Sequence, residues 1–231
     1  MNWRDFSGEE HATWKALFDK QSENRKSLAV PEFSRGLDAL AMSSDRIPDI
    51  DSINRRLAKL TGWRAIPVEG FEDPRSFYSM LARKEFPIGC FIRDSKDLSY
   101  TPAPDVFHDL YGHIPFFVDT AYANFCHEFG MRSSRDLNNT DRLRKWERLF
   151  WFTAEFALLD TPEGRRIFGG GLLSSYTESL YSLSGQPTLL PFDLKRIVVQ
   201  EFRIDIFQDP LFVLPAREAL FQCLDLYDAL L

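Results

Sequence analysis

The sequence has little cysteine and no excess of basic residues, and each shortage excludes a class of protein. Its three cysteines, Cys90, Cys126 and Cys223, are far apart, odd in number and form no CxxC pair. A disulfide framework is therefore excluded, and we expect a reducing compartment. The net charge of −6 offers no basic footprint for nucleic acid and disfavours an anionic membrane surface. We expect neither as a partner.

Long apolar runs are also missing. No stretch is long enough to span a bilayer, and the first residues, MNWRDFSGEEH, carry charges where a signal peptide has an apolar segment. We therefore expect a cytoplasmic protein that does not associate with a membrane. Internal repeats and low-complexity tracts are absent too.

The chain does have ample material for a core. Hydrophobic residues make up 44% of its 231 residues, and 21 are phenylalanine, which argues against disorder. Apolar residues at helical spacing dominate, and no linker divides the chain. We predict a mainly α fold with a few short β-strands (α+β), in a single domain over residues 1–231.

Local signals place the elements. A capping box at Ser7 and Glu10 predicts one helix start, and Asp73 followed by Pro74 predicts another. We predict six helices. The first begins at Ser7 and ends before Pro31, the second covers Ser52–Thr61 and is followed by Gly62, and the third begins at Pro74 and continues past Leu81. The other three cover Asp119–Gly130, Asp141–Leu159 and Ala216–Leu231. The predicted strands are Arg64–Val68, Gly89–Arg93 and Arg203–Phe207, with a glycine turn at Gly169–Gly171 and a second capping box at Ser175 and Glu178.

Two of the four histidines stand in one short stretch, YTPAPDVFHDLYGHIPFF, at residues 100–117. In an α-helix the side chains of His108 and His113 would point roughly 140° apart. The stretch is thus not an HExxH zinc motif, which places both histidines on one face. We expect a short helix that ends at Tyr111 and a positive φ at Gly112, which turns His113 back beside His108.

This pair of histidines has two interpretations. The rings could pack in an aromatic core with their nitrogens satisfied, or they could bind one metal ion. The rigid frame of proline and glycine around the pair favours the metal.

Glu155 suggests a third ligand. It lies in LFWFTAEFALL, which is apolar almost all round a helix, and an ionised carboxylate there is costly unless it is paired or bound to a metal. An ion pair with an arginine such as Arg93 is the alternative. Two histidines and one carboxylate form the facial triad of non-haem Fe(II) oxygenases, and zinc accepts the same ligands. From these residues alone, both metals stay open.

A family resemblance covers the histidine stretch and much of the chain. YTPAPDVFHDLYGHIPFF resembles the iron-binding signature of the tetrahydropterin-dependent aromatic amino acid hydroxylases, the phenylalanine-hydroxylating members in particular. Five further blocks between Arg56 and Leu214 resemble that family in the same order: RLAKLTGWRAIPVEGF, SFYSMLARKEFPIGCFIR, LFWFTAEFALL, FGGGLLSSYTESLYSL and FRIDIFQDPLFVL. Residues 1–51 show no clear match, and we expect them to be an N-terminal extension of a single catalytic domain. The regulatory domain and tetramerisation helix of the animal enzymes are expected to be absent, as in the short bacterial members, which suggests a monomer or dimer.

The resemblance implies the aromatic amino acid hydroxylase catalytic-domain fold and its chemistry. His108, His113 and Glu155 would be the ligands of Fe(II). Iron and a reduced tetrahydropterin would activate O2 together, and the ring of a free aromatic L-amino acid would be hydroxylated, with the cofactors supplying the hard chemistry. Phenylalanine is the default substrate. Tryptophan, or a different ring position of phenylalanine, is the alternative.

The resemblance also assigns residues to the substrate. Arg93 matches the arginine that binds the substrate carboxylate, and Asp105 matches the acid that orients it. Without the family, the two form a structural ion pair. The other substrate positions match Thr101 as a further carboxylate contact, Trp151 and Phe156 as the ring pocket, and Ser174 and Glu178 near the iron ligands and the substrate end. These last four residues would otherwise be ordinary helix core or helix caps.

Four residues match positions that bind the pterin. Phe77 corresponds to the ring that stacks on it, and Gly70 to a loop glycine that holds it by its backbone. Asp109 stands where animal members have a glutamate that reaches the pterin through water. Phe150 stands where the animal enzymes have a tyrosine.

Three departures bear on which pterin and which substrate bind. In the pterin loop GFEDPRSF, Glu72 and Pro74 replace residues that are small or apolar in the family. Ala157 replaces a glycine beside the ring pocket. Two functions of another class stay open beside the hydroxylase, namely a zinc hydrolase and a non-catalytic ligand-binding relative. The intact triad argues against a silent relative, and metal analysis would detect the hydrolase.

Overall fold

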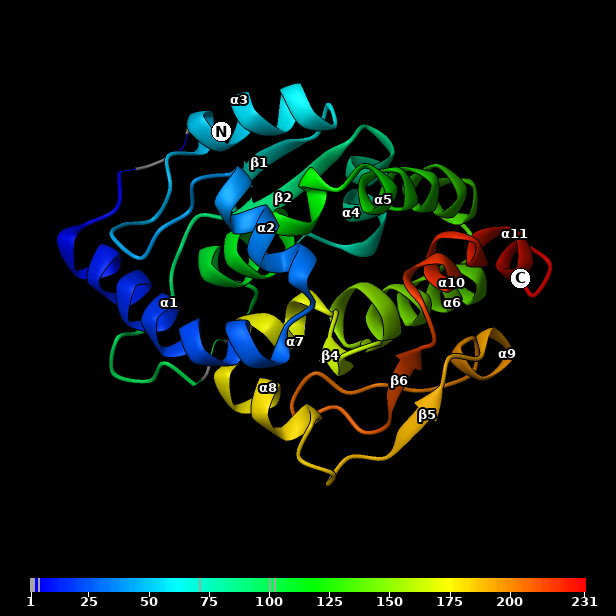
Figure 1. Cartoon of the computed structure of the whole chain (residues 1–231). Helices are drawn as coiled ribbons and strands as arrows, with labels where there is room; N and C mark the ends of the chain where they lie inside the picture. Colours follow the sequence, from blue (N-terminus) through cyan, green and yellow to red (C-terminus); the bar gives the residue numbers. More distant parts are fainter. Residues whose placement is uncertain (1–2, 4, 71, 100, 102) are drawn as a thin grey trace.

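The computed structural model describes residues 3, 5–70, 72–99, 101 and 103–231. Phe71 of the pterin loop, and Tyr100 and Pro102 of the histidine stretch, lie outside the described residues. Helices make up most of the structure, with two small sheets, one of them at the edge of the molecule (Figure 1). The prediction of a mainly α fold with a few short strands is confirmed.

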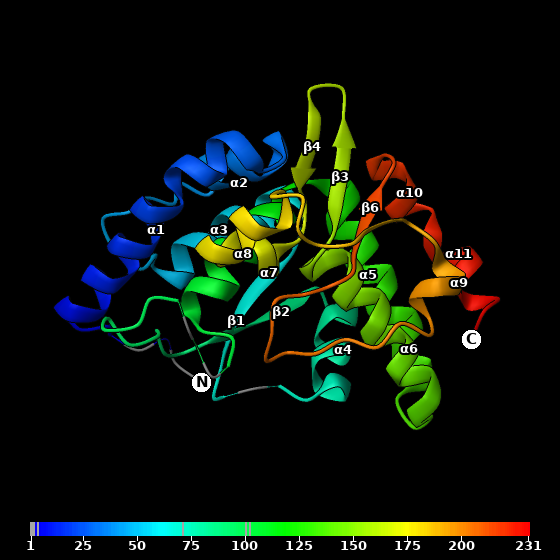
Figure 2. The ribbon, with the colours of Figure 1, turned by 90° about the horizontal axis from the view of Figure 1, so that it is seen from below.

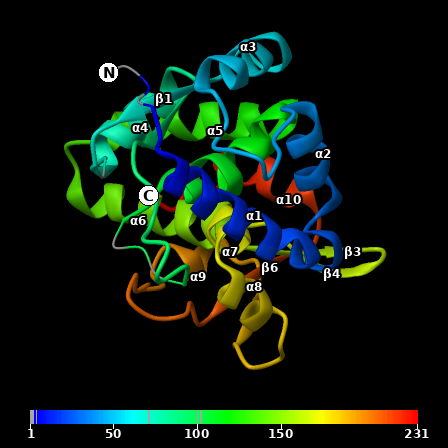
Figure 3. The same ribbon diagram turned by 90° about the vertical axis from the view of Figure 1, so that its left-hand side faces the viewer.

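The N-terminal part consists of three helices, α1 (Gly8–Leu28), α2 (Pro31–Ala39) and α3 (Ile50–Leu60). The capping box of Ser7 and Glu10 opens α1 as predicted. Pro31, expected only to follow the end of that helix, occupies the first turn of α2, where its missing N–H costs nothing. Figure 3 shows α1 crossing in front of α7 and α8, where the Gln21 side-chain amide donates to the Leu173 carbonyl.

A parallel pair of strands, β1 (Arg64–Val68) and β2 (Glu85–Gly89), flanks helix α4 (Pro74–Ala82). The prediction of β1 is confirmed, and Asp73 caps α4 as expected. The predicted strand Gly89–Arg93 is wrong, because β2 ends where that strand should begin. Side chains then replace strand partners: Gly89 N donates to the Asp109 carboxylate and Arg93 N to the Asp105 carboxylate.

The histidine stretch forms a π-helix, η1 (His108–His113), followed by a 3-10 helix, η2 (Ile114–Val118). Helix α5 (Thr120–Ser133) follows, capped by Asp119 as predicted, and leads into η3 (Ser134–Asp136). Gly130 does not end α5, so that expectation is wrong. It lies inside α5 because the helix packs closely on α4, where a Cβ on Gly130 would come within 2.3 Å of Ala82 N.

The long helix expected over Asp141–Leu159 is shorter than predicted. It consists of α6 (Thr140–Phe150) and a π-helical extension, η4 (Trp151–Glu155), and Leu158 already belongs to strand β3 (Leu158–Thr161). The apolar residues after Glu155 leave the helix because they pair with other strands. Leu158 faces Ile167 on one side and Val213 on the other.

Strand β3 belongs to a four-stranded sheet in the order β4-β3-β6-β5. The other strands are β4 (Gly164–Ile167), antiparallel to β3, and β5 (Leu189–Pro191) and β6 (Leu211–Leu214), which pair in parallel. The hairpin of β3 and β4 projects from the body (Figure 2). The predicted strand Arg203–Phe207 is wrong. These residues form bends with exposed side chains, and the sheet takes Leu211–Leu214 instead because those four residues are buried.

The remaining helices are short. They are α7 (Gly170–Ser174), α8 (Tyr176–Ser182), α9 (Leu194–Ile197), α10 (Arg217–Phe221) and α11 (Cys223–Asp228). Ser175 caps α8 as predicted, whereas the glycine turn is wrong, because Gly170 and Gly171 open α7. The single closing helix is divided at Gln222. Arg132 of α5 holds the second piece by ion pairs to Asp225 and Asp228.

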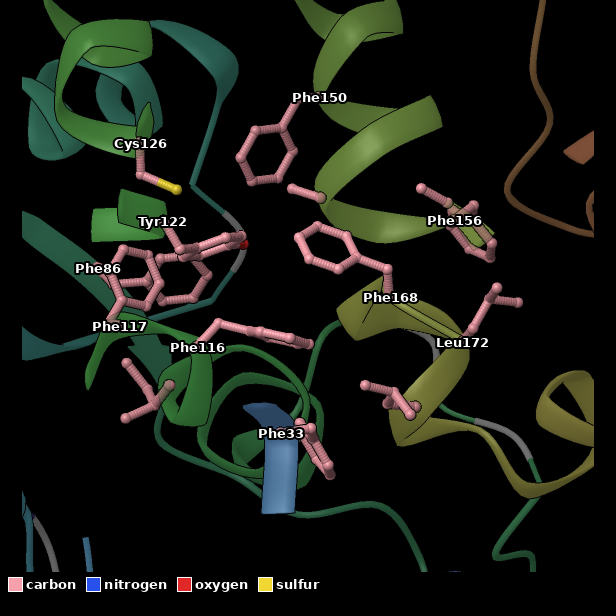
Figure 4. Close-up of a cluster of buried hydrophobic side chains, with 14 of the residues drawn as sticks. Phe33, Phe86, Phe116, Phe117, Tyr122, Cys126, Phe150, Phe156, Phe168 and Leu172 are labelled. Carbon is pink, nitrogen blue, oxygen red and sulfur yellow. The ribbon is translucent and has the colours of Figure 1, made fainter. Parts of the chain in front are cut away.

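Aromatic side chains join these elements into one core. Figure 4 shows rings from η2, α5 and the segment before α7 in contact, with Phe116, Tyr122 and Phe168 at the centre. Phe86 of β2 and Phe117 continue this cluster towards the histidines. Within the described ranges, no helix is both long enough and apolar enough to cross a membrane.

Candidate active site

Two π-helical turns carry the three proposed ligands. In η1, Ile114 N donates to the Asp109 carbonyl, and in η4 Phe156 N donates to the Trp151 carbonyl, both i→i+5 bonds. A turn closed by i→i+5 bonds brings residue i+5 over residue i. His113 therefore lies beside His108 without a break in the helix, and their Nε2 atoms are 3.1 Å apart.

The expectation that Gly112 turns the chain through a positive φ is wrong. Gly112 does not adopt a positive φ. A glycine is needed there because α7 lies against η1, and a Cβ would come within 2.6 Å of the Gly170 carbonyl oxygen and 3.1 Å of Ser174 Cβ. Close packing, not backbone freedom, explains this residue.

Glu155 completes a cluster of three donors. Its Oε2 lies 3.1 Å from His113 Nε2 and 3.7 Å from His108 Nε2, and the ligand atoms of the three residues all lie within 4.8 Å of one another. One cation with bonds of about 2.1 Å can reach donors at this spacing. The prediction that the three side chains converge is confirmed.

Ser174 orients one of the histidines. Its hydroxyl donates to the Gly171 carbonyl at 3.0 Å and lies 2.9 Å from His108 Nδ1. Since the hydroxyl proton is used, Nδ1 must carry the proton and donate, which leaves the lone pair of His108 on Nε2, facing the cluster. Such a partner fixes both the tautomer and the ring orientation of a metal-binding histidine.

The glycine run at the start of α7 lets its backbone touch the ligands. A Cβ on Gly170 would lie 2.7 Å from the His113 ring, and one on Gly171 would lie 2.9 Å from Glu155 Oε2. Both separations are far below ordinary contact. The run thus allows α7 to pack directly on the donor cluster, and Gly171 N–H also supports the Glu155 carboxylate.

Burial and mutual attraction set the charges at the cluster. Burial lowers the pKa of His108 to about 4, and His113 adds to this, although Glu155 opposes it. Burial also opposes ionisation of His113 and Glu155, but their attraction outweighs it, so the pKa of His113 is raised and that of Glu155 is lowered. His113 is 1% exposed, and its Nδ1 has no hydrogen-bond partner among the described residues. A neutral His108 beside an ionised carboxylate is a set of lone pairs suited to a cation.

Asp109 lies next to the cluster on η1. Burial raises the pKa of Asp109 to about 7, although its Oδ2 accepts a hydrogen bond of 2.7 Å from Gly89 N. The side chain lines the same cavity as the three donors.

Arg93 and Asp105 form a buried, bidentate pair. Arg93 Nε lies 2.8 Å from Oδ2 and its NH2 group 2.9 Å from Oδ1 of Asp105, which also accepts from His108 N at 2.9 Å. Burial opposes ionisation of Asp105, but the arginine outweighs it and lowers the pKa of Asp105. The pair thereby connects Arg93 to the segment that carries the first ligand.

A cavity of about 620 Å³ opens onto the donor cluster. Ten of the fourteen residues predicted for the site line it: Gly70, Phe77, Thr101, His108, Asp109, His113, Phe150, Trp151, Glu155 and Phe156. The other four, Arg93, Asp105, Ser174 and Glu178, are not among the lining residues. Ser174 contacts His108, whereas no hydrogen bond or ion pair joins Glu178 to any of the three donors in the described part of the chain.

The walls are mainly aromatic. Phe77 meets Phe150 edge to face at 5.1 Å, and Trp151 packs against Phe156 at 4.5 Å. Both departures noted in the pterin loop, Glu72 and Pro74, lie in the lining. Flat apolar walls around a few polar groups suit flat, partly polar ligands.

Part of the cavity lining was not predicted from the sequence. Phe202 stacks on Trp151 with ring centroids 4.4 Å apart, Ile204 lies at the rim, and Glu147 stands one helical turn before Trp151. The spacing of Glu147 could have indicated it, because residues i and i+4 share a helix face. Phe202 and Ile204 belong to an irregular segment whose position depends on tertiary contacts, such as the bond from Trp151 Nε1 to Gln208.

Comparison with known proteins decides the family. The model of the biopterin-dependent aromatic amino acid hydroxylases matches residues 3–227. The chain belongs to this family. The match includes residues 3–51, where the sequence blocks showed no resemblance, and it confirms the family suggested by the histidine stretch. The protein is therefore a biopterin-dependent aromatic amino acid hydroxylase.

Relatives and solved structures agree with this placement. The chain is 39% identical to phenylalanine-4-hydroxylase of Caulobacter vibrioides over 95% of its own length and 75% of that protein. It is 34% identical to the human phenylalanine-4-hydroxylase over 88% of its own length, but only 46% of the human protein. The structure of the Chromobacterium violaceum enzyme with iron(III) and 7,8-dihydrobiopterin matches with a TM-score of 0.90 and 38% identity, over 97% of this chain and 84% of that one. The expected catalytic-domain fold is confirmed.

Proposed function

We propose that this protein hydroxylates the ring of free L-phenylalanine with O2, using Fe(II) and a tetrahydropterin. The observation that carries the proposal is a cluster of two histidines and one carboxylate, with ligand atoms within 4.8 Å, opening onto a cavity walled by aromatic rings. The phenylalanine-4-hydroxylases related to the chain at 35–39% identity support phenylalanine as the substrate.

His108, His113 and Glu155 would hold the iron. The donor set fits, because two imidazoles and one carboxylate are the ligands that non-haem Fe(II) oxygenases use. The bound metal and pterin together would supply the oxidising chemistry. Ser174 keeps His108 in the tautomer that binds a metal, and the α7 backbone holds Glu155 in place. These residues fix the ligand orientation before the metal arrives.

Aromatic side chains would position the substrate and exclude water. Trp151 and Phe156 would enclose the substrate ring, with Phe202 behind Trp151. Thr101 lines the cavity and would contact the carboxylate of the amino acid. Arg93 would bind that carboxylate with the N–H groups that Asp105 leaves free, since a guanidinium has five donors. Glu178 would lie near the substrate end of the site, where burial raises the pKa of its carboxyl group.

On the other wall, Phe77 would stack on the pterin ring and Phe150 would support it from the side. Gly70, with a φ of 80°, turns the chain shortly after β1 where it lines the cavity, and its backbone would hold the pterin. Asp109 would accept hydrogen bonds from the pterin directly or through water.

Product analysis tests the proposal. Purified protein loaded with Fe(II) is incubated with tetrahydrobiopterin, O2 and either phenylalanine or tryptophan, and products are identified by mass spectrometry and NMR. We expect tyrosine from phenylalanine. Hydroxytryptophan, or hydroxyphenylalanine with another ring position substituted, would identify the alternative substrate or site of attack. The absence of any hydroxylated amino acid would contradict the proposed function.

Metal analysis separates the hydrolase alternative. We expect the activity to require iron. Stoichiometric zinc in the isolated protein, with no pterin-dependent O2 uptake after iron loading, would favour a hydrolase instead. Cys126 and Cys223 are free thiols, which agrees with a reducing compartment such as the cytoplasm, where we propose that the enzyme works. Light scattering during gel filtration tests the proposed monomer or dimer.

A further inference from the structure

Glu147 is a carboxylate of the cavity wall to which neither the sequence blocks nor the metal site assigns a role. It lies on α6, three residues before Phe150, and is half-buried. No hydrogen bond or ion pair joins its carboxylate to any residue in the described part of the chain. The neighbouring lining is aromatic, with Phe77, Tyr78 and Phe150.

Among the described residues, the positive charges near Glu147 do not form an ion pair with its carboxylate. Burial raises the pKa of Glu147, while Arg144 and Arg148 oppose that effect from a distance. The Arg148 guanidinium is already engaged by the Val198 carbonyl and the Glu201 carboxylate. A partly buried acceptor without a donor is unfavourable. The position is therefore suited to a ligand that brings donors.

The distance of Glu147 from the three proposed metal-binding residues indicates which molecule would bring these donors. Glu147 precedes Glu155 by eight residues, about two turns of the helix formed by α6 and η4, which separates them by on the order of 10 Å along its axis. Glu147 therefore lies well away from the metal. It adjoins Phe150, whose ring contacts Phe77, the residue proposed to stack on the pterin.

We propose that Glu147 determines pterin specificity by accepting hydrogen bonds from the hydroxyl groups of the pterin side chain. This inference rests on the proposed function. An ionised carboxylate only accepts hydrogen bonds, and hydroxyl groups donate. A pterin with a hydroxylated side chain satisfies Glu147, and one with a methyl group in its place leaves Glu147 unpaired.

Calorimetric binding tests this without turnover. The iron-loaded protein is titrated with 7,8-dihydrobiopterin, which has two side-chain hydroxyls, and with 6-methyl-7,8-dihydropterin, which has none. For Glu147→Ala we expect about tenfold weaker binding of dihydrobiopterin, as for a lost hydrogen bond to a charged group. Binding of the methyl compound should change less than about twofold by the same reasoning. Glu147→Gln should fall between wild type and Glu147→Ala, because its amide oxygen still accepts.

The control is Glu163→Gln, which removes one negative charge from the exposed turn between β3 and β4. It should leave both affinities unchanged. If Glu147→Ala fails to fold, the isosteric Glu147→Gln carries the comparison. Equal weakening of both pterins, or no weakening of either, overturns the inference while pterin-dependent hydroxylation by the wild type stands. If the wild type binds neither pterin, the proposed function fails with it.

Discussion

At the metal end of the cavity, backbone packs directly on the ligands. Gly170 leaves no room for a Cβ beside His113, Gly171 leaves none beside Glu155, and Ser174 is hydrogen-bonded to His108. At the outer end, part of the wall consists of side chains on irregular segments. Ile204, which lies at the rim, is 82% exposed, and Glu72 belongs to an irregular loop.

This difference separates two tasks. The metal end holds three ligand atoms within one coordination sphere, where a shift of even 1 Å is costly. The outer end selects the organic ligands, and loop side chains can be exchanged there without disturbing the metal. The family departures at Glu72 and Pro74 lie in this outer part, whereas Ala157 is buried two residues after Glu155. The predictions below test this division, from the largest expected effect to the smallest.

Removing a ligand should abolish the metal site. For His113→Ala we expect the affinity for iron to fall at least about 100-fold, because mutation of residues that only support a metal ligand already lowers metal affinity 10- to 100-fold. Turnover should disappear with the iron, and far-UV circular dichroism should still show a folded, helical protein. Metal content by mass spectrometry is the measurement. Full activity with unchanged iron content would place the site elsewhere.

Adding one methyl group beside the ligands should also be severe. Gly171→Ala places a Cβ 2.9 Å from Glu155 Oε2 and 3.0 Å from the Glu155 carbonyl oxygen. We therefore expect at least about tenfold weaker iron binding and roughly 1–3 kcal/mol lower unfolding free energy. Isothermal titration with Fe(II) and urea unfolding measure the two effects. The matched control is Gly8→Ala, because nothing lies within 4 Å of a Cβ there. Equal behaviour of the two variants would contradict the packing argument.

Arg93→Lys should affect the substrate and spare the pterin. A lysine keeps the charge but cannot form the bidentate pair with Asp105 while binding a carboxylate. We expect the KM for phenylalanine to rise about 10- to 100-fold, as when a charged hydrogen bond is lost, with the KM for the pterin within twofold of wild type by the same reasoning. Steady-state kinetics with each ligand varied in turn provides both values. The exposed Arg83→Lys serves as the control. An equal rise in both KM values would assign Arg93 to structure alone.

At the outer end, Phe202→Ala should have a moderate effect. Its ring stacks on Trp151, and such pairs contribute about 0.5–1.5 kcal/mol, so the KM for phenylalanine should rise roughly 2- to 10-fold. Iron content should stay the same. Phe207→Ala, in the same segment but outside the cavity lining, should leave the KM unchanged. Loss of iron from Phe202→Ala would show that the two ends are not independent.

The smallest effect is expected away from the cavity. Burial opposes ionisation of Asp119, but Tyr122 N–H and Arg217 outweigh it and lower the pKa of Asp119. Because the folded pKa is lowered, the ionised group stabilises the fold above the unfolded pKa of about 3.9, and this is lost as pH falls through the folded pKa. Asp119→Asn should cost about 1 kcal/mol at pH 7 and less at pH 2, with kcat unchanged. Urea unfolding at both pH values measures this, and an undiminished difference at pH 2 would contradict it.

Local signals in the sequence were sufficient to predict several helix starts. With the family blocks, they also pointed to the three side chains that converge in the structure. Ser7, Asp73 and Asp119 cap helices because each bonds to backbone N–H groups two or three residues away. A cap of this kind depends on neighbours in the chain alone, and so it is readable from sequence. The same holds for β1, bounded by Gly62 at a positive φ of 78°.

Long-range partners decided the rest. Leu158 continues an apolar helical pattern, yet it lies in a strand because Val213, 55 positions later, is its neighbour. Arg203–Phe207 alternates like a strand but has no strand beside it.

The histidine stretch shows both what local sequence predicts and what long-range contacts decide. From the sequence by itself we predicted that His108, His113 and Glu155 would meet, because their side-chain chemistry and the family blocks around them can be read there, and the structure brings them together. It did not determine how. Tertiary packing of α7 on η1 requires glycine at position 112 and aims both imidazoles at Glu155. The unpaired carboxylate of Glu147 became visible only with the cavity, because only the fold shows which face of a helix lines a space.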